Sequence, residues 1–342
     1  MKSILISGGA GFVGVNAANY FAERGWSISV LDNLSRRGTE DNLAWLRARH
    51  PVTFHEVDIR DAGAVASVIA ATKPDIVLHL AAQVAVTTSV ANPREDFEIN
   101  ALGTFNVLDA VRTESPKSFF INASTNKVYG KMEEIAVTER DGRYEYDTLT
   151  GGVSESQPLD FHSPYGCSKG VADQYVIDYA RIYGLDTVTF RQSCIYGTRQ
   201  FGIEDQGWVA WFTIAAVLGK QITIYGDGKQ IRDVLHVDDL ARAYEAAYLN
   251  RAASRGQAFN IGGGAGNTMS LIELLGLLQK ELKLNIPLKW GEWRPGDQPV
   301  FVCDIGKARE KLGWEPQVGV EQGVGQLIGW VRDNKQLFSW LK

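Results

Sequence analysis

A glycine-rich segment, SGGAGFVG, occupies residues 7–14, directly after the apolar run SILIS and before an amphipathic segment. Gly8, Gly11 and Gly14 follow one another at three-residue steps. Glycine at these steps permits a tight strand-to-helix turn and lets a pyrophosphate approach the helix N-terminus. Asp32 ends the next apolar run, eighteen residues after Gly14, where its carboxylate can accept hydrogen bonds from a ribose diol. The sequence therefore predicts a dinucleotide-binding βαβ unit.

The carboxylate of Asp32 also bears on which dinucleotide binds. It would repel a 2′-phosphate, so the sequence favours NAD over NADP. Arg36 and Arg37 follow closely and could pair with such a phosphate, although exposed loop arginines are the alternative interpretation.

Seven apolar runs alternate with amphipathic segments, which is typical of a parallel sheet covered by helices on both faces. The runs are SILIS, SISVLD, TFHEVD, DIVLHLA, KSFFINAS, DTVTFRQ and QAFNIGG. Residues 198–228 interrupt this rhythm, and the pattern after residue 262 is mostly helical, with a capping box predicted at SLIE. We predict an α/β chain: a Rossmann-type doubly wound parallel sheet with a smaller, mostly C-terminal substrate-binding lobe. The Rossmann domain would comprise residues 1–195 and about 233–262, and the lobe residues 196–232 and 263–342.

Composition excludes several classes of function. The 342 residues are 45% hydrophobic with a formal charge of −5, so the chain has enough apolar content for a large core and lacks the excess of positive charge typical of nucleic-acid binding. The opening MKSILIS is too short for a signal peptide or a membrane span, so we expect no membrane contact. The three cysteines have no metal-ligand spacing, and their odd number favours reduced thiols in the cytoplasm.

A second constellation lies in SPYGCSKG, where Tyr165 and Lys169 are four residues apart and would share one face of a helix. Tyrosine, with a pKa of about 10, is a poor base at neutral pH unless a neighbouring cation favours its phenolate. Lowering that pKa by roughly three units corresponds to about 4 kcal/mol. The pair therefore predicts proton transfer beside a bound dinucleotide.

With these residues the chain resembles the extended short-chain dehydrogenase/reductase superfamily of nucleotide-sugar enzymes over essentially its whole length. Further matching strings are DNLS, HLAAQ, KQIRDVLHVDD, FNIGG and RPGDQ. The resemblance implies that Thr125 joins Tyr165 and Lys169 as the catalytic triad, and that NAD is tightly bound.

The two residues after Thr125 separate epimerases from dehydratases. Relatives that remove water from the sugar carry Asp-Glu there, because elimination requires a general acid and a general base. This chain has Asn126 and Lys127 instead. We therefore expect a hydride to leave and return to the opposite face without elimination.

The strings STNKVYG, DFHSPYGCSKG, ADQY, YGTRQF, DQGWVAWF and GKQIRDVLH resemble the CDP-tyvelose (CDP-paratose) 2-epimerases. This implies inversion at C2 of a CDP-3,6-dideoxyhexose by a homodimer or homotetramer. A UDP-hexose 4-epimerase is the alternative, and a non-catalytic NAD-binding regulator is a second one.

The resemblance also implies binding residues by motif position. For the cofactor they are Gly8, Gly11, Phe12, Val13, Gly14, Asp32, Asn33, Ser35, Arg36, Asp58, Ile59, Leu80, Ala81, Ala82, Gln83, Asn100, Ser124, Tyr165, Lys169, Gln192 and Ser193. For the nucleotide sugar they are Thr87, Thr88, Thr125, Asn126, Cys194, Arg199, Gln206, Trp208, Val209, Tyr225, Arg232, Arg294 and Asp297, with Arg232 and Arg294 as diphosphate ligands. Cys194 stands where many relatives have asparagine, and for Trp208 packing within the lobe is the alternative. His162 is interpreted as a loop residue rather than a sugar ligand.

Overall fold

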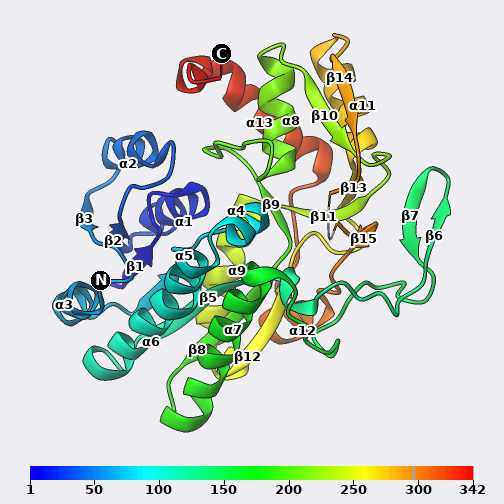
Figure 1. Ribbon diagram of the computed structural model, residues 1–342. Coiled ribbons are helices and arrows are strands. Elements are labelled where there is room, and N and C mark those ends of the chain that lie inside the picture. Colours follow the sequence, from blue (N-terminus) through cyan, green and yellow to red (C-terminus); the bar gives the residue numbers. More distant parts are fainter. Residues whose placement is uncertain (295–296, 342) are drawn as a thin grey trace.

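The computed structural model describes residues 1–294 and 297–341, and its largest element is a seven-stranded parallel sheet (Figure 1). The strands lie in the order β12-β8-β5-β4-β1-β2-β3. They are β1 (Ser3–Ser7), β2 (Ser27–Asp32), β3 (Val52–Glu56), β4 (Ile76–His79), β5 (Phe119–Thr125), β8 (Thr187–Gln192) and β12 (Gln257–Ile261). Each overlaps one of the seven predicted apolar runs, so the predicted Rossmann-type sheet is confirmed.

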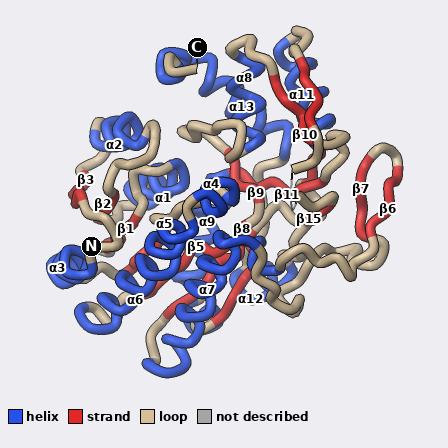
Figure 2. Tube along the Cα trace, in the orientation of Figure 1, coloured by secondary structure: helices blue, strands red, loops and turns tan. Residues whose placement is uncertain are grey.

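Helices cover both faces of this sheet because successive strand side chains point in opposite directions (Figure 2). Ile4 and Ile6 pack in one apolar cluster with Phe21, whereas Leu5 packs in a second cluster with Val65. The first cluster includes side chains of α1 (Phe12–Ala22), α2 (Thr39–Arg47), α9 (Val237–Leu249) and α12 (Gly306–Leu312). The second includes α3 (Ala62–Thr72), α6 (Gly103–Glu114) and α7 (Ser163–Tyr183).

The strand order reverses beside β1, and this reversal positions the site. From β1 the chain runs outward through β2 to β3, then returns to β4 on the other side of β1. Connections on the two sides of such a point leave toward opposite faces of the sheet, which opens a crevice at the carboxyl ends of the strands. The glycine-rich turn follows β1 and residues 80–85 follow β4, so both border this crevice.

A smaller part of the molecule has an apolar core of its own, which includes Phe212, Ile224, Leu274 and Leu327. Its sheets contain β9 (Cys194–Tyr196), β10 (Ile222–Tyr225), β11 (Ile231–His236), β13 (Thr268–Ser270), β14 (Leu288–Gly291) and β15 (Val300–Phe301). Its helices are α8 (Trp208–Val217), α11 (Leu271–Leu282), α13 (Val320–Asp333) and the 3₁₀ turn η3 (Lys335–Phe338). The capping box predicted at the start of α11 is present, between Ser270 and Glu273.

A hairpin that the sequence analysis did not predict extends from the body of the molecule (Figure 1). It consists of β6 (Val137–Arg140) and β7 (Arg143–Tyr146), and its base packs on Ile231 and Val300. The remaining short elements are α4 (Val86–Ala91), α5 (Pro93–Phe97), the π-helical turn η1 (Glu98–Leu102), the 3₁₀ turn η2 (Asn126–Tyr129) and α10 (Arg251–Ser254).

The packing of α12 differs from the predicted division of the chain, which assigned residues 263–342 to the smaller lobe. Ala308, Leu312 and Trp314 join the apolar cluster of the main sheet. The helix contacts α9 and β12, so its apolar face is buried there. Among the described residues, no helix has both the length and the apolar character needed to cross a bilayer.

Candidate active site

The three predicted catalytic residues come from two elements that the fold brings together. Thr125 ends β5, and Tyr165 and Lys169 lie one turn apart near the start of α7. The hydroxyl of Thr125 lies close enough to Tyr165 to lower the pKa of its phenol, and the ammonium of Lys169 donates to the carbonyl of Ala123 at 2.5 Å. All three residues are buried. The spacing of Tyr165 and Lys169 along α7 therefore places a phenol and an ammonium near the Thr125 hydroxyl, at the end of β5.

The electrostatics of Tyr165 differ from the sequence expectation that Lys169 lowers its pKa. Burial is the main cause that raises the pKa of Tyr165 to about 12; the charge of Asp96 acts in the same direction, and the Thr125 hydroxyl and Arg36 act against it. Burial also lowers the pKa of Lys169 to about 8, opposed by Asp173 and Asp96. The residues present therefore keep the phenol protonated at neutral pH, and further positive charge is needed to release its proton.

A buried polar network behind Tyr165 was only partly predicted. Asp96 accepts hydrogen bonds from Ser168 at 2.5 Å, from Gln83 at 2.8 Å and from Asn100 at 3.1 Å. Asn100 lies on the π-helical turn η1 and also donates to the carbonyl of Gln83 at 3.0 Å. The network fixes the loop after β4 against α7. Asp96 and Ser168 carry no motif that the sequence analysis could have used.

The glycine-rich turn has the close contacts that its composition predicts. A Cβ atom on Gly8, whose φ is +69°, would lie 2.6 Å from the backbone nitrogen of Ala81, and one on Gly14 would lie 2.3 Å from the carbonyl of Gly8. Helix α1 begins within this segment, at Phe12, with no side-chain cap and no acidic residue in its first turn. Free N–H groups at a helix N-terminus form a site for phosphate.

Asp32 faces this turn from the end of β2 and is 8% exposed. Burial raises the pKa of its carboxyl group, while hydrogen bonds from backbone N–H groups and the charge of Arg36 lower it. Arg36 also donates a hydrogen bond to Gln206, which precedes α8. This contact joins the loop after β2 to the smaller part of the molecule.

Several predicted cofactor residues that follow β2 and β3 lie in contact with neighbouring side chains. Asp58 accepts hydrogen bonds from the Arg60 guanidinium at 2.7 Å and 3.0 Å and from Asn33 at 2.9 Å. The Arg60 contacts hold the pKa of Asp58 below its usual range. Ser35 donates to Asn33 at 2.7 Å, and Ile59 is buried in the cluster beneath α3 and α6.

Three more predicted cofactor residues, near the ends of β5 and β8, have partners within the chain. Ser124 donates to Asp173 at 2.7 Å, and Asp173 pairs with Arg191 in an ion pair almost without solvent exposure. Gln192 donates to the hydroxyl of Tyr244 at 2.9 Å, and Ser193 donates to Asp233. These contacts fix the ends of β5 and β8 beside the catalytic residues.

A cavity of about 250 Å³ lies between the glycine-rich turn and the smaller part of the molecule. It brings together predicted cofactor and substrate residues from distant segments. Its lining consists of Phe12, Val13, Val84, Ser193, Cys194, Ile195, Gln200, Gln206, Gly207, Trp208 and Val209. The cavity therefore joins the N-terminus of α1 to residues that are predicted to bind the nucleotide sugar.

The predicted diphosphate ligands are held by carboxylates. Arg232 pairs with Asp297 at 2.7 Å, and Arg294 pairs with Asp205 at 3.0 Å. The guanidinium of Arg294 also lies 4.1 Å from the ring centre of Tyr225. Two residues of the RPGDQ string, 295 and 296, lie outside the described residues.

Other predicted substrate residues lie in varied surroundings. Arg199 stacks on Trp45, with its guanidinium 4.4 Å from the ring centre, which places its charge against α2. Thr87 and Thr88 are exposed on α4, and Asn126 accepts a hydrogen bond from Thr125 at 3.3 Å. His162 is half-exposed and hydrogen-bonded to Asp160 at 2.7 Å.

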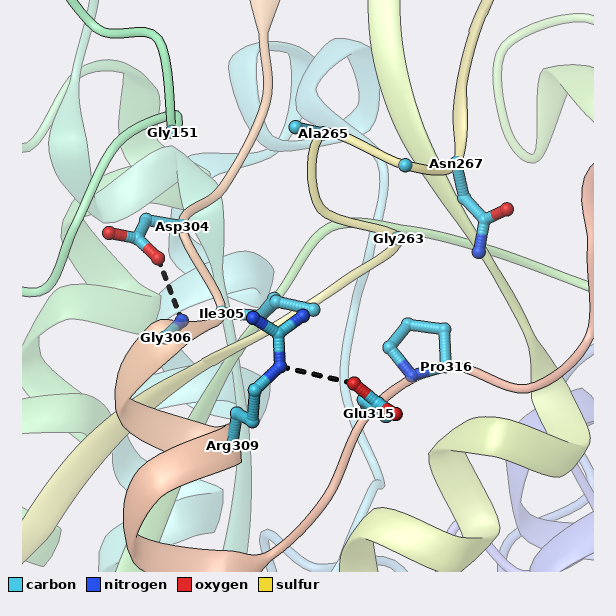
Figure 3. A pocket seen from close by; sticks show the side chains of 11 residues that line it. Gly151, Gly263, Ala265, Asn267, Asp304, Ile305, Gly306, Arg309, Glu315 and Pro316 are labelled. Atoms are coloured by element: carbon cyan, nitrogen blue, oxygen red, sulfur yellow. Dashed lines mark hydrogen bonds and ion pairs between the residues drawn. The ribbon is translucent and has the colours of Figure 1, made fainter.

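Another cavity, of about 340 Å³, lies apart from these residues (Figure 3). Gly263 and Asn267 line one side of it, and the pair of Arg309 and Glu315 lines the other, joined at 3.1 Å. It contains none of the predicted site residues. The convergence of Thr125, Tyr165 and Lys169 therefore identifies the candidate active site better than cavity size does.

Comparisons with known proteins agree with this geometry. Residues 5–327 match the family model described as GDP-mannose 4,6 dehydratase. A CDP-paratose 2-epimerase from Salmonella typhi is 47% identical over 332 residues, covering 96% of this chain and 98% of that protein.

Two solved structures share the fold. A UDP-glucose 4-epimerase from Thermus thermophilus in complex with NAD matches with a TM-score of 0.81 at 30% identity, covering 97% of this chain and 99% of that one. A dTDP-glucose 4,6-dehydratase from Streptomyces venezuelae with NAD and TYD bound matches with a TM-score of 0.85 at 28% identity, covering 99% and 100%. The chain belongs to the GDP-mannose 4,6 dehydratase family, whose members are NAD-dependent nucleotide-sugar epimerases and dehydratases of the extended short-chain dehydrogenase/reductase superfamily.

Proposed function

We propose that this enzyme inverts C2 of a CDP-3,6-dideoxyhexose of the CDP-paratose and CDP-tyvelose type. The observation that carries the proposal is the convergence of Thr125 and Tyr165, with Asn126 and Lys127 immediately after Thr125. These residues can move a hydroxyl proton, and neither Asn126 nor Lys127 supplies the carboxyl group that elimination needs. The 47% identity to a CDP-paratose 2-epimerase supports the choice of substrate.

The residues around the glycine-rich turn fit NAD. The close approach at Gly8 and the uncapped N-terminus of α1 suit a pyrophosphate, and the carboxylate of Asp32 suits an unphosphorylated ribose. When bound, NAD would supply the hydride acceptor and donor that the proposed inversion needs. The tight binding that we propose would keep the reduced cofactor beside the sugar between the two transfers.

The residues of the chain itself have separate roles in the proposed reaction. Tyr165 takes the proton of the reacting hydroxyl and later returns it to the oxygen. Thr125 hydrogen-bonds the same oxygen, and Lys169 is close enough to the end of β5 to bind the nicotinamide ribose. Burial raises the pKa of Tyr165 to about 12, so the phenol must first lose its own proton before it can act as a base. The positive charge of the oxidised cofactor would favour this loss.

The remaining predicted ligands stay part of the proposal as two groups. The group that would bind the cofactor is Gly8, Gly11, Phe12, Val13, Gly14, Asp32, Asn33, Ser35, Arg36, Asp58, Ile59, Leu80, Ala81, Ala82, Gln83, Asn100, Ser124, Gln192 and Ser193. The group that would bind the nucleotide sugar is Thr87, Thr88, Asn126, Cys194, Gln206, Trp208, Val209, Tyr225, Arg232, Arg294 and Asp297. Arg199 is the weakest member, because its guanidinium stacks on Trp45.

We also propose that the enzyme is a cytoplasmic homodimer or homotetramer. Five large apolar side chains are exposed along one face: Leu102 of η1, Phe105 of α6, and Val171, Tyr175 and Ile182 of α7. Exposed apolar side chains gathered on neighbouring helices favour a protein interface, and a second copy of the chain would bury them. All three cysteines are free thiols, as expected in a reducing compartment.

Incubation with CDP-, UDP- and GDP-hexoses tests the proposal directly, with the sugar products identified by NMR. We expect C2 inversion of a CDP-3,6-dideoxyhexose. C4 inversion of a UDP-hexose would identify the alternative 4-epimerase. Binding of NAD with no conversion of any sugar would favour a non-catalytic regulator.

A further inference from the structure

Lys127 has a feature that the proposed roles leave unexplained. It lies in η2, two residues after Thr125, and its backbone N–H donates to the Thr125 hydroxyl at 3.3 Å. Within residues 1–294 and 297–341, its ammonium makes one hydrogen bond, to Oε1 of Gln298 at 3.3 Å, and takes part in no ion pair. An ammonium has three donors, so most of its capacity stays available to a ligand.

The partner of Lys127 is held in place by other contacts. Gln298 is 5% exposed, and its side-chain amide donates to the carbonyl of Gly130 at 2.9 Å. Its backbone N–H donates to Asp297 at 3.0 Å, and the same oxygen of Asp297 accepts from Arg232 at 2.7 Å. Lys127 and Arg232 therefore lie at the two ends of one fixed chain of hydrogen bonds.

The charges along this chain do not balance. Lys127 and Arg232 are both cations, and Asp297 is the carboxylate between them. Burial and the charge of Arg232 lower the pKa of Lys127 to about 8, and Asp297 opposes them. A half-buried group with excess positive charge is stabilised by a bound anion.

The anion of a nucleotide sugar is its diphosphate, which is attached at C1. If C2 is the reacting carbon, it is bonded to C1, so the β-phosphate lies beside the oxygen that Thr125 and Tyr165 would contact. If C4 reacts instead, the β-phosphate lies across the sugar ring from that oxygen. A cation two residues from Thr125 is therefore suited to the β-phosphate in the C2 orientation.

We propose that Lys127 binds the β-phosphate of the nucleotide sugar and thereby places C2, rather than C4, at the reacting position. This inference rests on the proposed function and names the residue that would select its regiochemistry. Arg232 would bind the same diphosphate from its other side, with its guanidinium oriented by Asp297.

Calorimetric titration with CDP and with CMP isolates the β-phosphate contact. We compare the wild type, Lys127→Met, Lys127→Arg and the control Lys131→Met, which changes an exposed lysine four residues away. Loss of one charge-assisted phosphate contact should weaken CDP binding of Lys127→Met by about 30-fold or more. CMP binding should stay unchanged, Lys127→Arg should retain the preference for CDP, and the control should match the wild type. UDP and UMP are titrated in parallel.

The pH dependence of CDP binding separates a direct contact from a structural role. Affinity should fall as the pH rises through about 8, because Lys127 loses its proton there, whereas Lys127→Arg should keep its affinity. The other charged or titratable groups that act on Lys127 are Arg232, Asp297 and Cys194. Lys127→Arg retains all three, so any titration of Cys194 would appear in both proteins.

The outcomes distinguish this inference from the proposed function. If Lys127→Met keeps the wild-type preference for CDP over CMP, or if Lys127→Arg shows the same pH dependence as the wild type, the inference is wrong even though C2 inversion stands. If the wild-type enzyme inverts C4, or binds none of the four nucleotides, the proposed function fails and this inference with it. Circular dichroism establishes that each variant is folded.

Discussion

The carboxylate of Asp32 accepts a hydrogen bond from the backbone N–H of Ala10 at 3.0 Å, inside the glycine-rich turn. Its other oxygen accepts from the N–H of Leu34 at 2.9 Å. The Asp32 side chain therefore fixes both the glycine-rich turn after β1 and the loop after β2. A carboxylate that shapes the site in this way contributes to stability as well as to cofactor choice.

Substitution Asp32→Ala should reduce both the stability of the protein and its preference for NAD. The buried N–H of Ala10 loses its acceptor, which should lower the free energy of unfolding by about 1–3 kcal/mol. Loss of the negative charge should also narrow the preference for NAD over NADP. Urea denaturation measures the first effect and calorimetric titration the second. If the unmodified enzyme binds NADP more tightly than NAD, our interpretation of Asp32 is wrong.

The buried pair of Asp173 and Arg191 should be essential for stability. Asp173 is fully buried, pairs with Arg191 at 2.9 Å and accepts from Ser124 at 2.7 Å. Arg191→Met leaves this carboxylate without its cation, which should cost about 3–5 kcal/mol of unfolding free energy. Arg181→Met removes an exposed partner of Asp178 on the same helix and should cost less than about 1 kcal/mol. Equal losses in the two variants, measured by urea denaturation, would contradict the importance of burial.

Removal of an arginine that is proposed to bind the diphosphate should weaken binding of the nucleotide sugar far more than binding of NAD. Arg232→Ala and Arg294→Ala should each raise KM for the nucleotide sugar, because a charge-assisted contact to a buried phosphate contributes about 2–5 kcal/mol. The Kd for NAD should stay close to that of the wild type. Arg255→Ala, at an exposed ion pair with Asp186, is the control. Parallel losses of sugar and NAD binding would indicate misfolding or a wrong assignment.

Hydride transfer without elimination predicts the fate of an isotope label. A substrate with deuterium at C2 should yield a C2-inverted product that retains the label, with no deuterium gained from heavy water. Thr125→Val should slow this conversion strongly while leaving NAD bound, because it removes a hydrogen bond to the reacting oxygen. NMR of the products follows both experiments. Solvent deuterium at C2 would indicate deprotonation instead of hydride return, and a 4-keto-6-deoxy product would overturn the argument from Asn126.

Features that depend on short-range patterns could be predicted from the amino-acid sequence. Seven apolar runs predict the seven strands because a strand buried on both faces must be apolar along its length. The three-residue glycine steps predict the turn because only glycine tolerates backbone contacts as close as those of Gly8 and Gly14. The helical spacing of Tyr165 and Lys169 predicts that they share a face.

The environment of these residues depends on tertiary packing and could not be predicted in this way. Asp96 and Ser168 lie far apart in the sequence and carry no motif, yet they form the network behind Tyr165. Burial, rather than Lys169, dominates the pKa of Tyr165. Gln298 contacts Lys127 from 171 residues away in the sequence, and α12 packs on the main sheet instead of in the smaller lobe. Burial and long-range hydrogen bonds arise only when distant segments pack together, so no local pattern in the sequence encodes them.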